Sequence, residues 1–551
     1  MRNRFRKDLI DQETGTLLKD WHQKISVALV FPNAYSVGMS NLGFQTVYRL
    51  LNDCAHVVCE RVFVDATTQK SGCVSIESGR PLTDFHILAF SLFVESDFIH
   101  IVHALRLSEI SVYSNQRQAN EPLVMAGGVI TFLNPEPIAP FIDFFYIGEA
   151  ECLLPQLFDY LEPSQTRETN LDHIESLEGI YIPERHSGAV DSRKITRLFV
   201  PSIVNFDTCS SLITPLATFE NTYLVEVSRG CPHGCRYCGA GYVYRPPRFR
   251  TLEQLSASIE RGSQLAEKIA FMGAAVSDLP FLDRLCEHVY EKKMKLAFSS
   301  FRADAMSDQW LAYAVKTGIK TMTIAPDAGS ERLRQVVNKG MCESGILSCV
   351  EKLVCAGFIH IRIYLMIGLP TETWDDIEET VKFCQTIQSV FVKASRKNHK
   401  IGRITISLNN FIPKPSTPFQ WVGQEPVNVL KKKIHFIKKH VQKIPNVSLQ
   451  IDSPRKAMIQ ALLSCGDRQI AYLIETAYQL KGNWKQAIKE HNIPIEQRVG
   501  PKNITDVLPW DFLGMGFHRE YLAKEYQKAM DGKTSVDCQP GCVRCGVCRY
   551  E

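Results

Sequence analysis

The stretch Cys231-Pro-His-Gly-Cys235-Arg-Tyr-Cys238 decides how the rest of this 551-residue chain is interpreted. It follows an apolar run, residues 223–227, that predicts a buried strand. The spacing C-x3-C-x2-C places three thiols on one tight loop. Iron–sulfur clusters take thiolate ligands from such loops, and a 4Fe–4S cluster normally takes four. Three local ligands would leave one iron open for chemistry.

A zinc knuckle is the alternative interpretation of this loop, with His233 or a distant side chain as the fourth ligand. Structural zinc sites usually split their ligands into two distant pairs, which favours the cluster here. The chain has 18 cysteines, and seven of them form two tight groups. That pattern indicates metal chemistry rather than disulfides.

Composition is that of an ordinary soluble globular protein. Hydrophobic residues make up 45% of the chain and charged residues 22%, and the net charge is +4, so composition does not indicate a nucleic-acid partner. No run approaches the ~18–20 apolar residues that span a bilayer, and no apolar segment follows the polar amino terminus. We therefore expect a cytoplasmic protein without membrane segments.

The first 152 residues alternate between strand-like and helix-like patterns. This alternation predicts an open, Rossmann-like parallel sheet with helices on both faces, whose ligands bind at the carboxyl ends of the strands. The expected strands are residues 25–31, 57–64, 87–93, 124–126 and 144–147. The pattern weakens over residues 153–217, which we interpret as a connecting segment.

The central third of the chain, residues 218–445, repeats a strand–helix pattern six times. Six units are enough for a partial (β/α)6 barrel but too few for a closed eight-fold barrel. The cysteines follow the first strand, and polar or glycine-bearing segments follow the other five, as a bound small molecule would need. The expected strands are residues 223–227, 269–272, 296–300, 321–325, 360–367 and 404–408.

Three motifs of this region resemble the radical S-adenosylmethionine (SAM) enzymes. The first is the cysteine loop with Tyr237 before its last cysteine. The segments Ala325-Pro-Asp-Ala-Gly-Ser-Glu-Arg-Leu-Arg334 and Tyr364-Leu-Met-Ile-Gly-Leu-Pro-Thr-Glu-Thr373 resemble later strands of the subgroup that includes the methylthiotransferases. Asp327 is a departure, because that subgroup usually has Glu there. The whole chain resembles an uncharacterised bacterial branch of the superfamily with a cobalamin-binding-type leading domain.

The resemblance implies that Cys231, Cys235 and Cys238 hold a 4Fe–4S cluster whose fourth iron binds SAM. One electron, from a donor such as flavodoxin or ferredoxin, then splits SAM into methionine and a 5′-deoxyadenosyl radical. The backbone of Gly273 is expected to receive the methionyl amine and that of Phe411 and Ile412 to flank the adenine. The candidate SAM contacts are Tyr237, Gly273, Ser300, Arg302, Glu331, Phe411 and Ile412.

The leading domain resembles cobalamin-binding domains at Phe90-Ser-Leu92, Gly127-Gly128 and Gly148-Glu-Ala-Glu151. The family's D-x-H-x-x-G motif should follow the first strand, but Tyr35-Ser-Val-Gly-Met-Ser stands there. The segment Asp84-Phe-His86 precedes the third strand and lacks the glycine. Some relatives bind cobalamin without that histidine, so cobalamin is a candidate cofactor.

Two basic stretches lie near the barrel. Arg245-Pro-Pro-Arg248-Phe-Arg250 is either a contact for an anionic substrate or the SAM carboxylate, or a solvated exit loop. Lys431-Lys-Lys433 lies on a predicted helix and is interpreted as a solvated helical face rather than an RNA contact.

The terminal region, residues 446–551, is predicted to be mostly helical and ends in a second cysteine group. Its spacing is C-x3-C-x2-C-x2-C, which gives a closed set of four thiols. A zinc ribbon would space its two pairs further apart, so the compact motif favours a second iron–sulfur cluster over zinc. The ligands would be Cys538, Cys542, Cys545 and Cys548.

Together these features predict an α/β radical SAM enzyme that modifies an unidentified substrate by methylation, sulfur insertion or rearrangement. The alternative is a non-catalytic iron–sulfur or zinc protein for electron transfer or scaffolding. Polar residues at six strand ends favour the enzyme, because an electron carrier does not need them.

Overall fold

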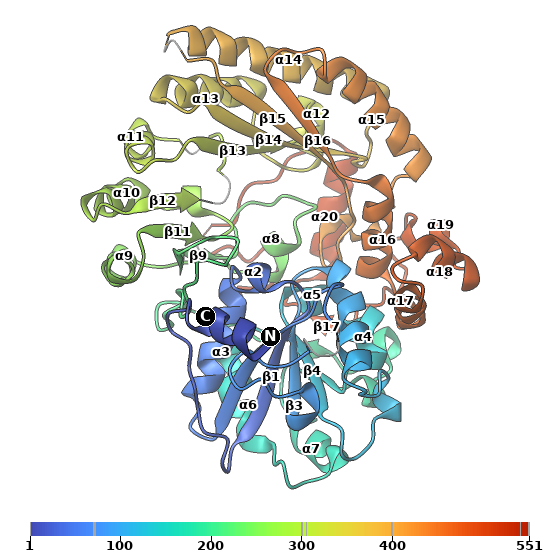
Figure 1. Ribbon diagram of the computed structural model, residues 1–551. Helices are drawn as coiled ribbons and strands as arrows, with labels where there is room; N and C mark the ends of the chain where they lie inside the picture. The colour runs from blue at the N-terminus through green and yellow to red at the C-terminus, as the bar shows by residue number, and fades with distance from the viewer. Residues whose placement is uncertain are drawn as a thin grey trace. The chain divides into compact units, whose positions relative to one another are not determined.

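The computed structural model describes residues 2–69, 73–298, 301–304, 306–397, 400–539 and 541–548 (Figure 1). Two compact units emerge, each built from separate stretches of chain. Unit 1 comprises Met1–Thr222, Leu462–Pro494 and Thr505–Gly516, and unit 2 comprises Tyr223–Ala461, Ile495–Ile504 and Phe517–Glu551. The segment expected to be a connection, residues 153–217, therefore belongs to unit 1, and the terminal region is divided between the units.

Unit 1 is built on a six-stranded sheet in the order β2-β1-β3-β4-β5-β6. Strands β1 to β5 are parallel, and β6 pairs antiparallel with β5. All seven residues of β1 are buried, as expected for a parallel strand covered on both faces. The five strands expected from the sequence are present, and β6 completes the sheet. Their bounds are β1 Ile25–Phe31, β2 Val57–Phe63, β3 Ile87–Ser91, β4 Leu123–Gly127, β5 Phe144–Tyr146 and β6 Ile180–Tyr181.

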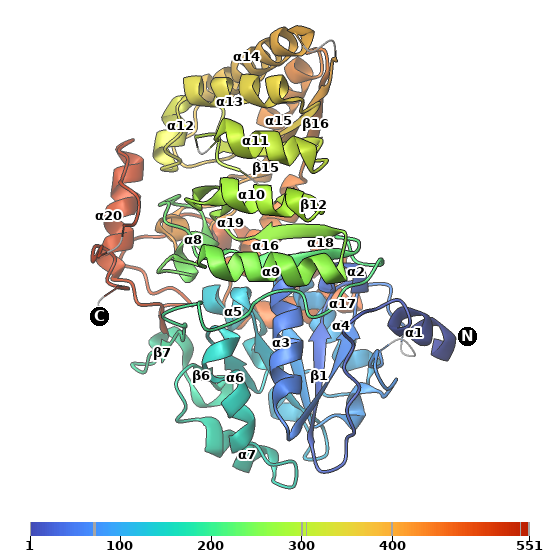
Figure 2. The same ribbon diagram turned by 90° about the vertical axis from the view of Figure 1, so that its left-hand side faces the viewer.

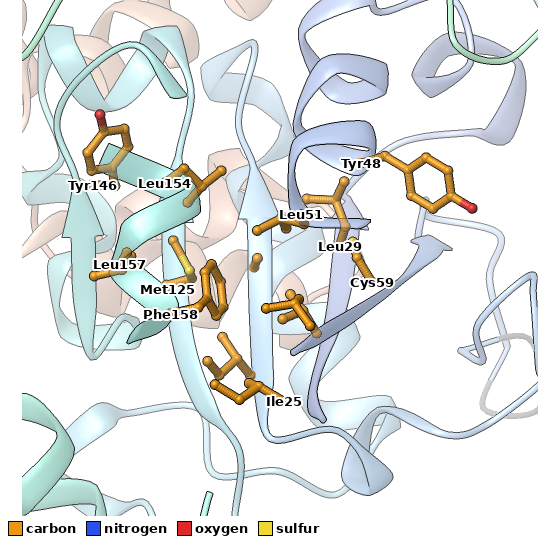
Figure 3. Packing of buried hydrophobic residues seen from close by; sticks show 14 of the residues in the cluster. Ile25, Leu29, Tyr48, Leu51, Cys59, Met125, Tyr146, Leu154, Leu157 and Phe158 are labelled. Atoms are coloured by element: carbon orange, nitrogen blue, oxygen red, sulfur yellow. The ribbon is translucent and has the colours of Figure 1, made fainter. Parts of the chain in front are cut away.

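Helices cover both faces of this sheet. On one face, α3 (Leu42–Asp53) and α6 (Ala150–Leu157) bury a cluster against β1 and β4. Figure 3 shows Leu51 and Leu154 reaching toward Leu29 and Met125 in this cluster. Helix α4 (Phe98–Leu107) contributes no residue to the cluster and packs instead with α17 (Ile470–Gln479), which comes from the terminal region.

Strand order in unit 1 reverses between β1 and β3. Doubly wound sheets bind ligands in the crevice at such a reversal, outside the carboxyl ends of the strands. The segments after Phe31 and Ser91 therefore border the expected crevice.

Unit 2 contains a three-stranded sheet, β12-β11-β8, and a four-stranded parallel sheet, β13-β14-β15-β16. A parallel bridge between Phe301 and Ile324 links the segment after β12 to β13. The strand–helix alternation continues around this series, which is a partial barrel. The strand bounds are β8 Thr222–Glu226, β11 Lys268–Met272, β12 Lys295–Phe298, β13 Thr321–Asp327, β14 His360–Ile367, β15 Arg403–Asn410 and β16 Val447–Ile451.

Helices lie on one side of these strands in chain order (Figure 2). Alternate residues of β14 are buried, from Ile361 to Ile367, and those between them are only half-buried. The buried residues face the helices, and the other face stays accessible at the concave side. The helices are α9 Leu252–Leu265, α10 Leu282–Glu291, α11 Asp308–Lys316, α12 Glu331–Val336, α13 Glu343–Ala356, α14 Trp374–Lys397 and α15 Val427–Val441.

Several elements of unit 2 were not predicted from the sequence, among them α10 and β16. Strand β16 follows α15 and pairs in parallel with β15, so it extends the sheet beyond the six expected strands. Its residues are only partly buried, which weakens the apolar pattern of a buried strand.

The terminal region is helical, as expected. Among the described residues, no helix is long and apolar enough to cross a membrane. Its helices are α16 Pro454–Cys465, α17 Ile470–Gln479, α18 Trp484–Glu490, α19 Ile495–Val499 and α20 Arg519–Met530.

Candidate active site

The three-cysteine loop follows the carboxyl end of β8, through the short strand β9 (Ser228–Arg229), and leads into α8 (Gly239–Val243). Gly230 turns the chain with a φ of +79°. A Cβ at this position would lie 2.4 Å from the carbonyl oxygen of Tyr244, so only glycine fits. The position after the first strand agrees with the sequence prediction.

The three thiols are close to one another and shielded from solvent. Burial raises the pKa of Cys231 to about 12 and that of Cys235 to about 11, and nearby Cys238 raises both further. Burial likewise raises the pKa of Cys238. Ligand binding by these thiols therefore has to release protons.

Within the described residues, no three His, Cys, Asp or Glu side chains gather tightly enough for a single metal ion. A 4Fe–4S cluster places each thiolate on a different iron, so its ligands spread more widely than those of one ion. Three buried thiols on one loop fit such a cluster in donor type.

Tyr237 lies between two of the cysteines and is half-buried. Its hydroxyl donates a hydrogen bond to Asp327 Oδ2, at the end of β13. The same oxygen accepts from Lys339 Nζ at 2.6 Å. Tyr237 also packs against the apolar cluster that contains Phe411.

Arg236 anchors the cysteine loop, and its side chain is completely buried. Its guanidinium donates to the carbonyl oxygens of Gln335, Val336 and Lys533 at 2.8–3.2 Å. It also contacts Glu525 of α20 at 3.2 Å. This one side chain thus ties the cysteine loop to the end of α12 and to the terminal region.

His233 takes part in a second set of contacts. Its Nε2 lies 2.7 Å from Asp278, after β11, and its Nδ1 lies 2.8 Å from Asp537 in the tail. Burial lowers the pKa of His233, but the hydrogen bonds to the two carboxylates outweigh this effect and raise it to about 9. His233 is thus engaged on both ring nitrogens by carboxylates, and these contacts do not match the zinc-ligand alternative.

Asn338, with a φ of +55°, completes the anchoring. Its Nδ2 donates to the carbonyl of Gly234 at 3.2 Å, and its Oδ1 accepts from the amide of Ser535 at 2.7 Å. The amide of Cys538 donates to the carbonyl of Pro232 at 2.7 Å. The terminal segment therefore lies directly against the cysteine loop.

The four terminal cysteines lie near one another in this segment. The thiolates of Cys542, Cys545 and Cys548 add to the effect of burial in raising the pKa of Cys538 to about 11, while Arg245 lowers it. Arg544 Nε donates to the Cys542 sulfur at 3.2 Å, and this bond holds the pKa of Cys542 below its usual value despite partial burial. Four neighbouring thiols beside Arg245 and Arg544 suit an anionic metal–thiolate group in donor type.

The basic loop after α8 is structural rather than solvated. Arg245, which is 3% exposed, donates to the carbonyl of Gly241 and stacks over the ring of Tyr242 at 4.4 Å. Arg250 is also buried, and it contacts both the backbone and the carboxylate of Glu226. The prediction of a solvated exit loop is therefore wrong, because each arginine satisfies buried acceptors of the loop's surroundings.

The expected solvated lysine face on α15 needs a similar correction. Lys431 and Lys432 are exposed, but Lys433 is buried and lies 2.6 Å from Glu425 and 3.7 Å from Glu372. A buried lysine of this kind requires a carboxylate partner.

The predicted SAM contacts lie in different settings. Gly273 packs directly on Ser228, where a Cβ would meet the Ser228 hydroxyl at 2.5 Å. Arg302 is engaged by Asp304 at 2.7 Å. Ser300 lies outside the described residues.

The remaining SAM candidates come from later strands. Glu331, half exposed at the start of α12, accepts from the amide of Glu343 at 3.1 Å. Phe411 is 1% exposed and packs on Phe419, and its amide donates to the carbonyl oxygen of Ile367 at the end of β14. Ile412, next to it, is half-buried.

Sequence reasoning missed four residues of this assembly: Asp278, Lys339, Asn338 and Arg236. The buried hydroxyl of Ser228 is a further one, since it has no hydrogen-bond partner among the described residues. None of the four carries a spacing signal: Arg236 is a single arginine within the loop, and the other three follow β11 or α12 far along the chain.

Polar side chains also gather in unit 1 at the carboxyl ends of β1 and β3, where the strand order predicts a crevice. Asn33 donates to Asp97 at 2.9 Å, and His100 contacts the carbonyl of Pro32 at 2.8 Å. Burial raises the pKa of Asp97 to about 7, although the bond from Asn33 opposes this. Gly128, with a φ of +106°, would place a Cβ 2.3 Å from the Leu92 carbonyl.

His86, by contrast, lies at the amino end of β3. Its Nδ1 contacts the Ser26 amide at 2.9 Å, at the edge of the sheet opposite the crevice. The Asp84-Phe-His86 segment is therefore not a displaced cobalt-ligand motif.

Two family models match the chain. The model of the radical SAM superfamily matches residues 225–384, which contain the cysteine loop and the strands up to β14, and the model of radical SAM proteins, N-terminal, matches residues 43–183. This chain is a member of the radical SAM superfamily. It is a radical SAM enzyme, and the alternative of a non-catalytic electron carrier is set aside. The family implies a 4Fe–4S cluster and SAM as its cofactors.

One curated relative extends over most of this radical SAM enzyme, and two others match smaller parts of it. An uncharacterized protein of Methanocaldococcus jannaschii is 27% identical over 455 residues, which cover 82% of this chain and 90% of that protein. An uncharacterized methyltransferase of Pyrococcus horikoshii is 24% identical over 48% of this chain and 58% of its own length. A tRNA-2-methylthio-N(6)-dimethylallyladenosine synthase of Hydrogenobaculum is 23% identical over 31% of this chain and 42% of its own length.

A solved structure shares the fold. The cobalamin-dependent S-adenosylmethionine radical enzyme OxsB, with aqua-cobalamin bound, matches with a TM-score of 0.50 and 13% identity, over 93% of this chain and 80% of that one. This agreement supports the predicted order of a Rossmann-like sheet followed by a partial barrel.

Proposed function

We propose that Cys231, Cys235 and Cys238 hold the 4Fe–4S cluster and that SAM binds its fourth iron at the concave side of unit 2. Bound there, the cluster would supply the electron that splits SAM into methionine and a 5′-deoxyadenosyl radical. The observation that carries the proposal is the loop itself: three shielded thiols at the carboxyl end of the first strand, fixed by Arg236 and Asn338.

The test is anaerobic reconstitution with iron and sulfide, followed by dithionite and SAM. We expect 5′-deoxyadenosine or S-adenosylhomocysteine from the wild type and neither from Cys231→Ala. Cys342→Ser is the matched control, because Cys342 is an exposed cysteine outside both groups. Equal product from wild type and Cys231→Ala would refute the assignment.

The seven SAM contacts named from the sequence remain proposals. The contacts of Tyr237, Gly273 and Phe411 favour these three, since each packs next to the cysteine loop or its apolar support. Arg302 is paired with Asp304, and Glu331 accepts from the amide of Glu343. To contact SAM, each of these side chains has to give up that partner.

We infer that unit 1 binds cobalamin at the β1/β3 crevice. The strand reversal and the polar residues after β1 and β3 support this site, and the OxsB structure carries cobalamin on the same fold. No histidine occupies the D-x-H-x-x-G position, so protein ligation of cobalt from that place is not part of the proposal. Anaerobic titration with hydroxocobalamin, followed by gel filtration and visible absorbance, should give stoichiometric retention, and no retention would refute it.

The reaction that fits both cofactors best is methyl transfer to an unidentified substrate. Cobalamin carries methyl groups, and a named methyltransferase is among the relatives. Sulfur insertion is the second candidate, because a methylthio-forming synthase is also a relative. S-adenosylhomocysteine formed together with 5′-deoxyadenosine would favour methyl transfer, and methionine without S-adenosylhomocysteine would oppose it.

We also propose a second iron–sulfur cluster at Cys538, Cys542, Cys545 and Cys548. The support is their mutual proximity and the bond from Cys538 to Pro232, which sets the group beside the first loop. An electron-donor protein such as flavodoxin or ferredoxin is the expected partner.

A further inference from the structure

Lys339 is an unusual residue to find buried beside a cysteine loop. It follows α12 and is only 8% exposed. Lysine is almost never buried without a partner, and the partner here is Asp327, itself 7% exposed. Such a pair is costly to desolvate, so its retention calls for an explanation.

The pair is directed at the cysteine loop. Asp327 accepts hydrogen bonds from both Lys339 and Tyr237, and Tyr237 stands between Cys235 and Cys238 in the chain. The ammonium of Lys339 is near enough to these two thiols to favour their charged forms against the effect of burial. Lys339, Asp327 and Tyr237 therefore form a chain of hydrogen bonds that ends on the loop.

The backbone of Asp327 is part of this arrangement. Its φ is +66°, a region that residues other than glycine seldom occupy. Strain of this kind is tolerated where the surroundings demand a particular placement. Here it sets the carboxylate between the lysine and the tyrosine, at the position where the related subgroup carries Glu.

We propose that Lys339 raises the reduction potential of the cluster at Cys231, Cys235 and Cys238, and that Asp327 holds the lysine in place and partly offsets its charge. The proposal rests on the cluster assignment above. A thiolate-bound cluster gains one more negative charge when it is reduced, so a fixed cation nearby stabilises the reduced form more than the oxidised form. Net charge and solvent exposure are among the properties that set such potentials, and burial keeps solvent from screening this charge.

Three variants of the reconstituted full-length enzyme test the proposal in potentiometric titrations followed by electron paramagnetic resonance. Lys339→Gln should lower the midpoint potential of the three-cysteine cluster, because Asp327 remains without its cation. Asp327→Asn should raise it, because the lysine charge is no longer offset. Lys339→Arg keeps the charge and should stay near the wild type. The terminal cysteines are replaced by serine in every sample, so that only one cluster contributes.

Lys433→Gln is the matched control, since Lys433 is also a buried lysine paired with carboxylates, Glu425 and Glu372. Shifts of the same sign for Lys339→Gln and Asp327→Asn, or a shift for Lys339→Gln no larger than for the control, would overturn the proposal. If Lys339→Gln fails to take up iron, the midpoint potential of Asp327→Asn still tests the proposal, because it has to lie above that of the wild type. A wild type that takes up no cluster refutes the cluster assignment instead.

Discussion

At the scale of single residues, the cysteine loop depends on neighbours that do not themselves bind a cofactor. Arg236 is the strongest example, because one completely buried guanidinium satisfies three carbonyl oxygens and one carboxylate. Charged hydrogen bonds of this kind are strong, and their loss leaves buried acceptors without partners.

Arg236→Ala should therefore destabilise unit 2 by about 3 kcal/mol, since three carbonyl oxygens lose their charged donor, while Glu525 keeps Lys528 and Ser535 as partners. Denaturant unfolding followed by tryptophan fluorescence measures the loss. Lys438→Ala, on the exposed face of α15, is the control and should change stability by less than about 0.5 kcal/mol. Similar losses for the two variants would show that Arg236 does not anchor the loop.

Gly230→Ala should abolish cluster uptake, because the added Cβ meets a backbone oxygen at 2.4 Å and the φ is positive. Iron content after reconstitution is the measurement. Gly318→Ala is the matched control: its φ is +90°, but no atom lies within 4 Å of its Cβ, so it should lose about 1 kcal/mol of stability and keep its iron. Normal iron content in Gly230→Ala would contradict the structure of this turn.

At the scale of elements, the candidate functional residues lie at the carboxyl ends of strands. The reversal of strand order places the segments after β1 and β3 side by side, and the parallel series of unit 2 places Asp278, Asp327 and the cysteine loop at successive strand ends. Perturbed pKa values mark both places, as they often do at functional sites.

Asp97 at the β1/β3 crevice gives a pH prediction. Burial raises its pKa to about 7 from an ordinary value of 3.8, so the folded state holds more protons than the unfolded state between these pH values. Its contribution to stability is present at low pH and is lost as pH rises through about 7.

Asp97→Asn should remove this loss. As pH rises from 5 to 8, the unfolding free energy of the variant should therefore increase by on the order of 2 kcal/mol relative to that of the wild type. Denaturant unfolding at both pH values measures the difference, and Asp84→Asn, an exposed change at the opposite edge of the sheet, is the control. A difference that does not change with pH would mean that Asp97 is ionised in the folded state throughout this range.

At the scale of the whole molecule, the chain is assembled from sequence segments that lie far apart. Helix α17, more than 350 residues after α4, packs on it in unit 1, where Glu475 contacts Tyr113 at 2.6 Å. In unit 2 the terminal segment returns to the first strand's loop, where Asp537 contacts His233 and Cys538 contacts Pro232.

Replacement of all four terminal cysteines by serine should halve the iron content of the reconstituted enzyme, from about eight to about four per chain. Serine keeps the backbone bonds of the tail, so the first cluster should remain and SAM cleavage with dithionite should persist. Iron and acid-labile sulfide counts, with zinc measured alongside, provide the test. Loss of zinc with unchanged iron would contradict the second cluster.

The sequence by itself determined the α/β architecture, most of the strands of both units and the three motifs that identify the superfamily. These features are local: alternating apolar runs specify strands and helices, and cysteine spacing specifies a thiol-bearing loop. The nature of β16 and the burial of Arg245 and Lys433 were not predicted, because each depends on which distant groups cover them.

Only the tertiary structure decided what surrounds the loop. Asp278 follows β11, whereas Asn338 and Lys339 both follow α12, and no spacing in the chain connects these residues to Cys231. The fold brings them together because parallel strands present their carboxyl ends at one edge, and hydrogen bonds to buried carboxylates then fix each side chain. The tail contacts the loop because the carbonyl oxygen of Pro232 needs a hydrogen-bond donor, and the amide of Cys538 provides it. A loop shielded from solvent cannot leave such backbone groups unpaired.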